Sequence, residues 1–220
     1  MADSPSNLPH TSVPTSDAPT HSAINTSRRR LTGAGLGISA IFTLASRPVL
    51  AAQCTSASAA ASGNLSQHGT PLQCTGRTPG YWKNPESRGS GKFWPDGYKQ
   101  GTCSGGGCSS SPENWGGGTG FHPEFQGSKF TISNNSLSMN QVMILNNSTY
   151  LGITDEHNLG SHIVAALLNA ASGKTDGVLT IATVKAMWSE CQTKGYFEPM
   201  AGAKWTPAQV VAYLKTTMTL

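Results

Sequence analysis

One short segment carries most of the acid and base groups that hydrolytic chemistry would need. It reads DEHNLGSH at 155–162, and the candidate groups are Asp155, Glu156, His157 and His162. Carboxylates and imidazoles can act as general acid and base. The cluster has neither the HExxH spacing of a zinc protease nor the G-x-S-x-G turn of a serine hydrolase. It could equally be the acidic start of a helix, so a secreted hydrolase is the alternative function.

A second set of polar residues surrounds a short aromatic motif, GYWKN at 80–84. His162 and Asn169 are seven residues apart in an apolar run, so they share one face of a helix. If the motif folds over that face, a small polar binding site results. Its candidate residues are Trp82, Lys83, Asn84, His162 and Asn169. The simpler interpretation is structural: Trp82 anchors the motif, Asn169 bonds the motif's backbone, and His162 is a solvated residue of the first helical turn.

The five cysteines predict disulfides with one thiol left over. All five lie after residue 51, and an odd number cannot pair completely within one chain. Cys103 and Cys108 enclose only SGGG, which can fold back to bring the two sulfurs together. Cys54 with Cys74 is the second predicted pair, and Cys191 remains unpaired.

A metal site is the competing use of the cysteines. It would combine Cys103 and Cys108 with some of His68, His122, His157 and His162. The C-x4-C spacing is loose for zinc, and no second pair of ligands follows at the usual distance. The sequence therefore predicts no metal, no other cofactor and no catalytic residue set.

Residues 1–51 have the character of an export signal. A Ser/Thr/Pro-rich extension, predicted to be disordered, precedes SRRRL at 27–31 and an apolar stretch of 16 residues at 31–46. This stretch is shorter than the roughly 20 residues of a membrane-spanning helix. Arg28 and Arg29 resemble a twin-arginine signal, although Thr32 departs from that pattern; an ordinary secretory leader is the alternative. We expect a protein exported to the periplasm or beyond, with no transmembrane helix in the mature chain.

Charge argues against a nucleic-acid partner. Four of the fifteen basic residues and two of the eleven acidic residues lie in the leader, so residues 52–220 are nearly neutral. Binding to a phosphate backbone needs a basic surface.

Residues 52–73 have the composition of a low-complexity linker, and residues 74–135 form an irregular segment rich in Gly and aromatic residues. Turn signals such as Pro79-Gly80 interrupt any regular period there. The segment cannot build a core alone, so its aromatic side chains must pack on helices or line a groove. These side chains are Tyr81, Trp82, Phe93, Trp94, Tyr98, Trp115, Phe121, Phe125 and Phe130.

Residues 136–220 contain four helix starts. Ser138 and Thr206 each begin a capping box, Thr180 begins a third helix, and Ser161 begins a fourth that ends near Gly173. The fourth is apolar around most of its circumference and should be the most buried. The predicted fold is mainly α: a small bundle of about four helices with the irregular segment packed on it, in a single domain at 74–220.

RTPGYWKN at 77–84 and SHIVAALLNA at 161–170 together resemble a group of secreted bacterial proteins. That group pairs a TPGYWKNHP segment with a helix of the form HAVAALLNA, and the leader SRRRLTGAG is similar to its exported members. The resemblance covers residues 74–220 and implies architecture and location but no mechanism. Pro85 stands where the group usually has His, so no role based on a ligand there carries over.

These observations favour an exported bacterial protein that acts as a non-catalytic binding or structural module, in the periplasm, secreted or at the cell surface. The aromatic and Gly-rich segment provides contact surface without an evident nucleophile. The expected partner is a cell-surface polymer or another surface protein.

Overall fold

The computed structural model describes residues 54–63, 72, 74–84, 94–145 and 148–219. All of them belong to residues 47–220, one of two units into which the chain divides. Helices dominate this described part, and its strands occur only in two-stranded pairs. None of its helices is long and apolar enough to cross a membrane. The predicted leader lies outside the described residues.

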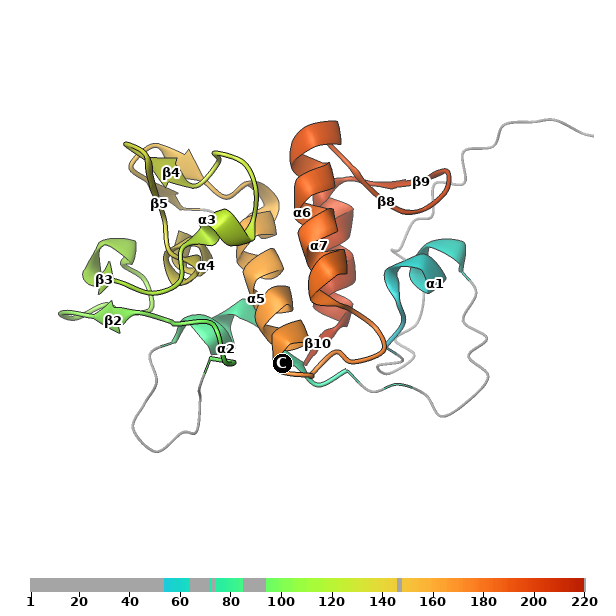
Figure 1. Ribbon diagram of the computed structural model, residues 1–220, viewed down its shortest axis with the longest axis horizontal. Coiled ribbons are helices and arrows are strands. Elements are labelled where there is room, and N and C mark those ends of the chain that lie inside the picture. The colour runs from blue at the N-terminus through green and yellow to red at the C-terminus, as the bar shows by residue number, and fades with distance from the viewer. Residues whose placement is uncertain (1–53, 64–71, 73, 85–93, 146–147, 220) are drawn as a thin grey trace, which may run out of the picture. The chain divides into compact units, whose positions relative to one another are not determined.

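Helix α5 (Leu159–Ala171) is the centre of the fold. It packs against α4 (Met139–Leu145), α6 (Ile181–Lys194) and α7 (Pro207–Thr216), and Figure 1 shows it between α4 on one side and α6 and α7 on the other. Every residue of α5 from 159 to 169 is buried. The described part is therefore mainly α, as predicted, and its central helix is the buried, apolar one.

The local caps explain where three of these helices begin. Ser138 and Gln141 exchange bonds ahead of α4: the Ser138 N–H donates to Gln141 Oε1 at 2.8 Å, and the Gln141 N–H donates to Ser138 Oγ at 3.2 Å. Thr206 and Gln209 form the same capping box before α7. The Thr180 hydroxyl accepts the N–H of Thr183 at 3.1 Å before α6. Each cap satisfies amide groups that lack a partner at a helix start.

The start of α5 differs from the prediction. The helix begins at Leu159, and Ser161 lies inside its first turn. The carboxylate of Asp155 accepts the N–H groups of Gly160 and Ser161 at 2.8 Å each, so the cap comes from upstream of the helix. The predicted end is correct, because Gly173 follows the helix with φ +71°, where glycine is favoured.

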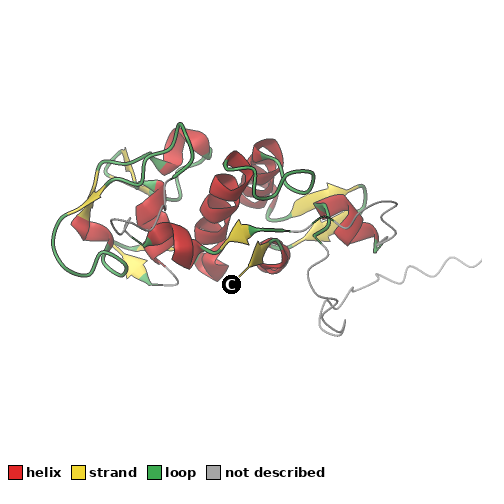
Figure 2. Cartoon of the chain, turned by 90° about the horizontal axis from the view of Figure 1, so that it is seen from below, coloured by secondary structure: helices red, strands yellow, loops and turns green. Residues whose placement is uncertain are grey.

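Short strand pairs tie the periphery of the helical core, as Figure 2 shows in yellow. Strand β1 (Gly76–Arg77) runs parallel to β10 (Met218–Thr219) and so joins the two ends of the predicted domain. The remaining pairs are antiparallel: β2 (Thr102–Cys103) with β3 (Trp115–Gly116), β4 (Thr131–Ile132) with β5 (Asn135–Ser136), β6 (Thr149–Tyr150) with β7 (Ile153–Thr154), and β8 (Phe197–Met200) with β9 (Ala203–Trp205).

The irregular segment packs its aromatic side chains on the helices. It contains the 3-10 turn η3 (Pro112–Asn114) and the short helix α3 (Phe121–Glu124). Phe121, Phe125 and Phe130 lie around Trp188 of α6, with ring centroids 4.9, 6.1 and 5.6 Å from it. Of the nine aromatic residues predicted to pack or to line a groove, Phe93 is outside the described residues. Six are buried: Trp82, Trp94, Trp115, Phe121, Phe125 and Phe130.

Part of the stretch predicted as a linker is packed on the core. Helix α1 (Ala57–Ser62) contacts β8, and Ala57 is buried. The Tyr213 hydroxyl of α7 donates to the Thr55 carbonyl at 3.0 Å. The alanine-rich stretch therefore forms a short helix whose small side chains allow close packing, and it is not only a low-complexity linker.

The two predicted disulfides are present. Cys54 is bonded to Cys74 with 5.3 Å between the Cα atoms, and Cys103 is bonded to Cys108 with 5.9 Å. Cys191 is unpaired and buried. Burial raises the pKa of its thiol to about 11, with the charge of Glu190 acting in the same direction, so it is a poor thiolate.

Replacing Cys54 and Cys74 together by alanine should lower the free energy of unfolding by about 3 kcal/mol, because the bond closes a loop of 20 residues. The Cys103–Cys108 bond closes a much shorter loop, so replacing both of these cysteines by alanine should cost about 2 kcal/mol. Urea denaturation of both variants measures the difference. Non-reducing peptide mapping must first recover both pairs; a peptide joining Cys191 to any partner would contradict this assignment.

Candidate functional site

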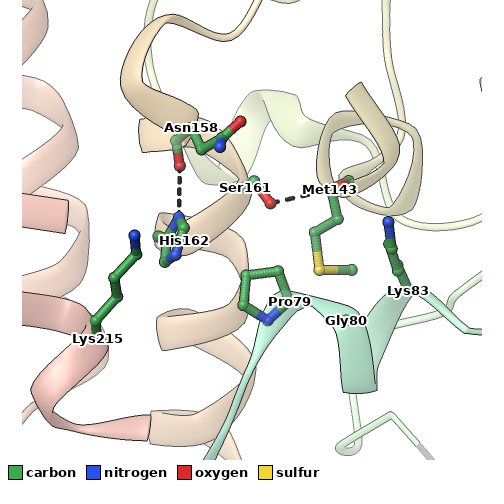
Figure 3. A pocket seen from close by; sticks show the side chains of 8 residues that line it. All are labelled: Pro79, Gly80, Lys83, Met143, Asn158, Ser161, His162 and Lys215. Carbon is green, nitrogen blue, oxygen red and sulfur yellow. Dashed lines mark hydrogen bonds between the residues drawn. The ribbon is translucent and has the colours of Figure 1, made fainter. Parts of the chain in front are cut away.

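A hollow of about 280 Å³ lies where the short helix α2 (Pro79–Lys83) meets the first turn of α5. Figure 3 shows its walls coming from α2, α4, α5 and α7. The lining residues are Pro79, Gly80, Lys83, Met143, Asn158, Ser161, His162 and Lys215. Two of the five predicted binding residues, Lys83 and His162, are among them.

Helix α2 positions Lys83 at this hollow. The sequence suggested only a turn at Pro79-Gly80, but Thr78 caps a single helical turn by accepting the N–H of Tyr81 at 3.4 Å. Pro79 occupies a first-turn position, where its fixed φ suits a helix and its missing N–H costs nothing. The turn prediction was therefore too weak, and Lys83 stands at the end of a helix.

Trp82 and Asn169 are not among the described lining residues of the hollow, and they hold α2 and β1 on α5. Asn169 Oδ1 accepts the Arg77 N–H at 2.7 Å and the Trp82 indole N–H at 3.0 Å. Asn169 Nδ2 donates to the Arg77 carbonyl at 2.9 Å. Trp82 is 4% exposed and Asn169 is fully buried. Both side chains therefore have the geometry of the structural interpretation, in which Asn169 bonds the backbone of the motif.

The segment at 94–100 completes the support of α2. The Trp82 carbonyl accepts the Trp94 indole N–H at 3.2 Å and the Gln100 amide at 3.0 Å. The same Gln100 amide donates to the Asn84 carbonyl at 3.0 Å. Asn84 thus contributes its backbone, while its exposed side chain does not line the hollow. Sequence spacing does not reveal Arg77 or Gln100, because Arg77 bonds Asn169 through its own backbone and Gln100 bonds the backbone carbonyls of Trp82 and Asn84.

His162 is buried rather than solvated, so the expectation of a solvated ring is wrong. Its Nδ1–H donates to the Asn158 carbonyl at 2.8 Å, which leaves the lone pair of the neutral ring on Nε2. Burial lowers the pKa of His162, and the nearby charge of Lys215 lowers it further, while the Asn158 carbonyl acts in the opposite direction. The ring is therefore held mostly neutral at pH 7.

Lys83 and Lys215 give the hollow its charge. Within the described residues neither ammonium has a carboxylate within 4.0 Å, since the ion pairs found there involve Lys129, Lys185 and Lys194. None of the lining residues that the structure describes is acidic. Lys215 comes from the last turn of α7, far from α2 in sequence, so local spacing could not reveal it.

The acid and base cluster at 155–162 does not converge. Asp155 is fully buried as the cap of α5, and burial raises the pKa of its carboxyl although its two amide donors act in the opposite direction. Glu156 is exposed and lies 3.8 Å from Lys129, and His157 is also exposed. In the described part of the chain no hydrogen bond or ion pair joins any two of these side chains or joins them to His162. This arrangement lacks the coupled acid and base of a hydrolase.

Among the residues that the structure describes, no three His, Cys, Asp or Glu side chains lie close enough together to hold a metal ion. Cys103 and Cys108 are consumed in their disulfide. His68 and Pro85 lie outside the described residues.

Comparison of the chain with models of protein families, with curated proteins and with solved structures finds no match.

Proposed function

We propose that this chain is an exported bacterial protein, periplasmic, secreted or at the cell surface, that works as a non-catalytic binding module. The observation that carries the proposal is the hollow beside α2, where Lys83 and Lys215 face a common space without an acidic partner among the described residues. A cationic hollow without a coupled nucleophile, acid and base suits binding better than bond cleavage.

Export is supported by the leader and by the disulfides. Arg28 and Arg29 precede a short apolar stretch, and the mature part holds two disulfides, which persist in oxidising compartments. The partner is a component of the cell envelope, either a polymer or a surface protein.

Retention on isolated cell envelopes tests the binding function. The exported protein should cosediment with envelopes, and Lys83→Gln with Lys215→Gln should release it, while Lys99→Gln removes an exposed charge elsewhere and should not. If retention survives protease treatment of the envelopes, the partner is a polymer. If the treatment abolishes retention, the partner is a surface protein. Absence of retention, or release of polymer fragments by the protein, would overturn the proposal, the latter in favour of a hydrolase.

Replacing Arg28 and Arg29 together by lysine should stop export, because a twin-arginine signal requires the arginine pair itself. The precursor should then accumulate in the cytoplasm, as measured by fractionation and immunoblotting. Unchanged export would assign an ordinary secretory leader instead. Mass spectrometry of the exported wild-type protein should place its first residue near Ala51 or Ala52.

A further inference from the structure

The two lysines of the hollow line it from different helices. Figure 3 shows Lys215 of α7 and Lys83 of α2 on opposite sides of Pro79, with Ser161 and His162 along the α5 wall between them. An anion in this space has one ammonium group on each side, and both attract it.

No internal carboxylate takes this role in the described residues. Asp155 caps the start of α5, but both its oxygens accept amides of the helix start, and neither Asp155 nor Glu156 lines the hollow. The remaining polar groups of the lining are the Ser161 hydroxyl, the His162 ring and Asn158, whose side-chain oxygen is buried without a hydrogen-bond partner. The Ser161 hydroxyl donates to the Met143 carbonyl at 3.4 Å, so the groups that the site offers to an anion are the two ammonium groups.

Size restricts what the hollow accepts. At about 280 Å³ it is slightly smaller than the roughly 300–1,000 Å³ of pockets that enclose whole drug-sized ligands. Met143 and Pro79 form apolar walls beside the charged groups. These dimensions suit one charged group with its attached carbon or sugar atoms, projecting from a larger molecule.

We propose that the hollow between α2, α5 and α7 binds an oxyanion, a carboxylate or phosphate group borne by an envelope polymer, between Lys83 and Lys215. This inference rests on the binding function proposed above and names the chemistry of its ligand. Ammonium groups bind both kinds of oxyanion through charge-assisted hydrogen bonds.

Binding is coupled to protonation of His162. Its Nδ1–H is committed to the Asn158 carbonyl, so a proton added at Nε2 creates the ring's positive charge. Lys215 from α7 opposes that charge, Lys83 from α2 adds a second cation to the lining, and α4 contributes only Met143 to it. A bound oxyanion offsets this repulsion and raises the pKa of His162. Affinity therefore rises as pH falls through the pKa of the complex and levels off below the lower pKa of the free protein.

Titration of the exported protein with glucuronate and with inorganic phosphate, followed by NMR of the His162 ring protons and by calorimetry, tests this site. We expect at least one of the two anions to bind and to raise the His162 pKa, and glucose to do neither. Lys83→Gln and Lys215→Gln should each weaken binding about tenfold, the size of one charge-assisted hydrogen bond. Lys99→Gln should leave affinity unchanged. Glucuronate stays ionised between pH 7.5 and 5.5, so tighter binding at the lower pH reports the protein's own groups.

The outcomes separate the ligand chemistry from the function. Binding of phosphate alone points to a phosphodiester polymer, and binding of glucuronate alone points to a polyuronate. Retention on envelopes without any response of His162 to either anion would overturn the oxyanion site and leave the binding function standing. Anion binding that depends on both lysines, without retention on envelopes, would support the site and contradict the proposed function.

Discussion

Trp82→Ala should lower the free energy of unfolding by about 3–5 kcal/mol, the cost of emptying a buried aromatic site. The indole is 4% exposed, and it forms a T-shaped pair with the Tyr81 ring, with ring centroids 5.1 Å apart. Its N–H also supplies one of the two donors to Asn169 Oδ1. The variant loses packing and leaves a buried acceptor less well satisfied, so both effects have the same sign. Urea denaturation followed by circular dichroism measures the loss.

Two matched variants separate these contributions. Trp82→Phe keeps most of the apolar area and removes the bond to Asn169, so it should cost only about 1–2 kcal/mol. Asn169→Ala leaves the Arg77 N–H and carbonyl without their partner and should cost about 3 kcal/mol. Because both side chains share one bond, the double variant should be less destabilised than the sum of the single variants by about 1 kcal/mol. Full additivity, with Trp82→Ala within about 1 kcal/mol of wild type, would instead make Trp82 a binding platform.

This result determines how binding experiments are interpreted. Loss of binding in Trp82→Ala would follow from unfolding of α2 and would say nothing of ligand contact. Lys83 stands one residue further along the helix, lines the hollow and makes no ion pair among the described residues. Substitutions of Lys83 therefore report on the ligand, and substitutions of Trp82 report on the fold.

Helix starts were predictable because their causes are local. Ser138 with Gln141 and Thr206 with Gln209 each satisfy amides within one turn, so four consecutive residues contain the whole signal. The same reasoning holds for the Cys103–Cys108 disulfide, whose loop is too short to bring in the rest of the chain. The cap by Asp155 could not be predicted from spacing. Its carboxylate reaches the helix start across a turn in which His157 and Asn158 have positive φ, and residue spacing does not encode that conformation.

The candidate site was only partly predictable, because most of its lining is brought together by tertiary contacts. Lys83 and His162 stood out as polar residues in notable motifs. Lys215 entered the site because α7 packs beside α5, and its sequence context is that of an ordinary last-turn lysine. Asn169 was predictable as a bonding residue because a buried amide needs partners, whereas the identity of those partners, a backbone segment and an indole, depends on the fold.

Phe130→Ala should also cost about 3–5 kcal/mol, and it tests how the irregular segment is seated on the central helix. The ring is fully buried, with centroids 4.8 Å from Phe121 and 5.6 Å from Trp188. It fills the space that Gly160 leaves open on α5. A Cβ added at Gly160 would lie 2.6 Å from two Phe130 ring carbons and 2.9 Å from a methyl of Val142.

Gly160→Ala sets two effects of opposite sign against each other. Alanine gains about 1 kcal/mol of helix propensity over glycine, whereas overpacking a rigid core costs about 1–3 kcal/mol. The Phe130 ring is held by two aromatic neighbours and cannot move aside, so the overpacking dominates and the variant should be destabilised. Gly80→Ala is the matched control in α2, because its added Cβ would meet only Thr78 Oγ1 at an ordinary 3.6 Å, and it should be neutral or slightly stabilising.

Combining Phe130→Ala with Gly160→Ala tests whether the Phe130 ring occupies the space above Gly160. In the Phe130→Ala background the close contact with the ring is gone, although the contact with the Val142 methyl remains. The favourable helix propensity of alanine then makes a larger relative contribution to the free energy of unfolding. Gly160→Ala should therefore cost at least about 1 kcal/mol less in this background than in wild type, or should stabilise it. Urea denaturation of the four proteins gives the coupling. If the two substitutions are additive, Phe130 does not occupy the space above Gly160, and the irregular segment is held on the bundle by its other aromatic side chains alone.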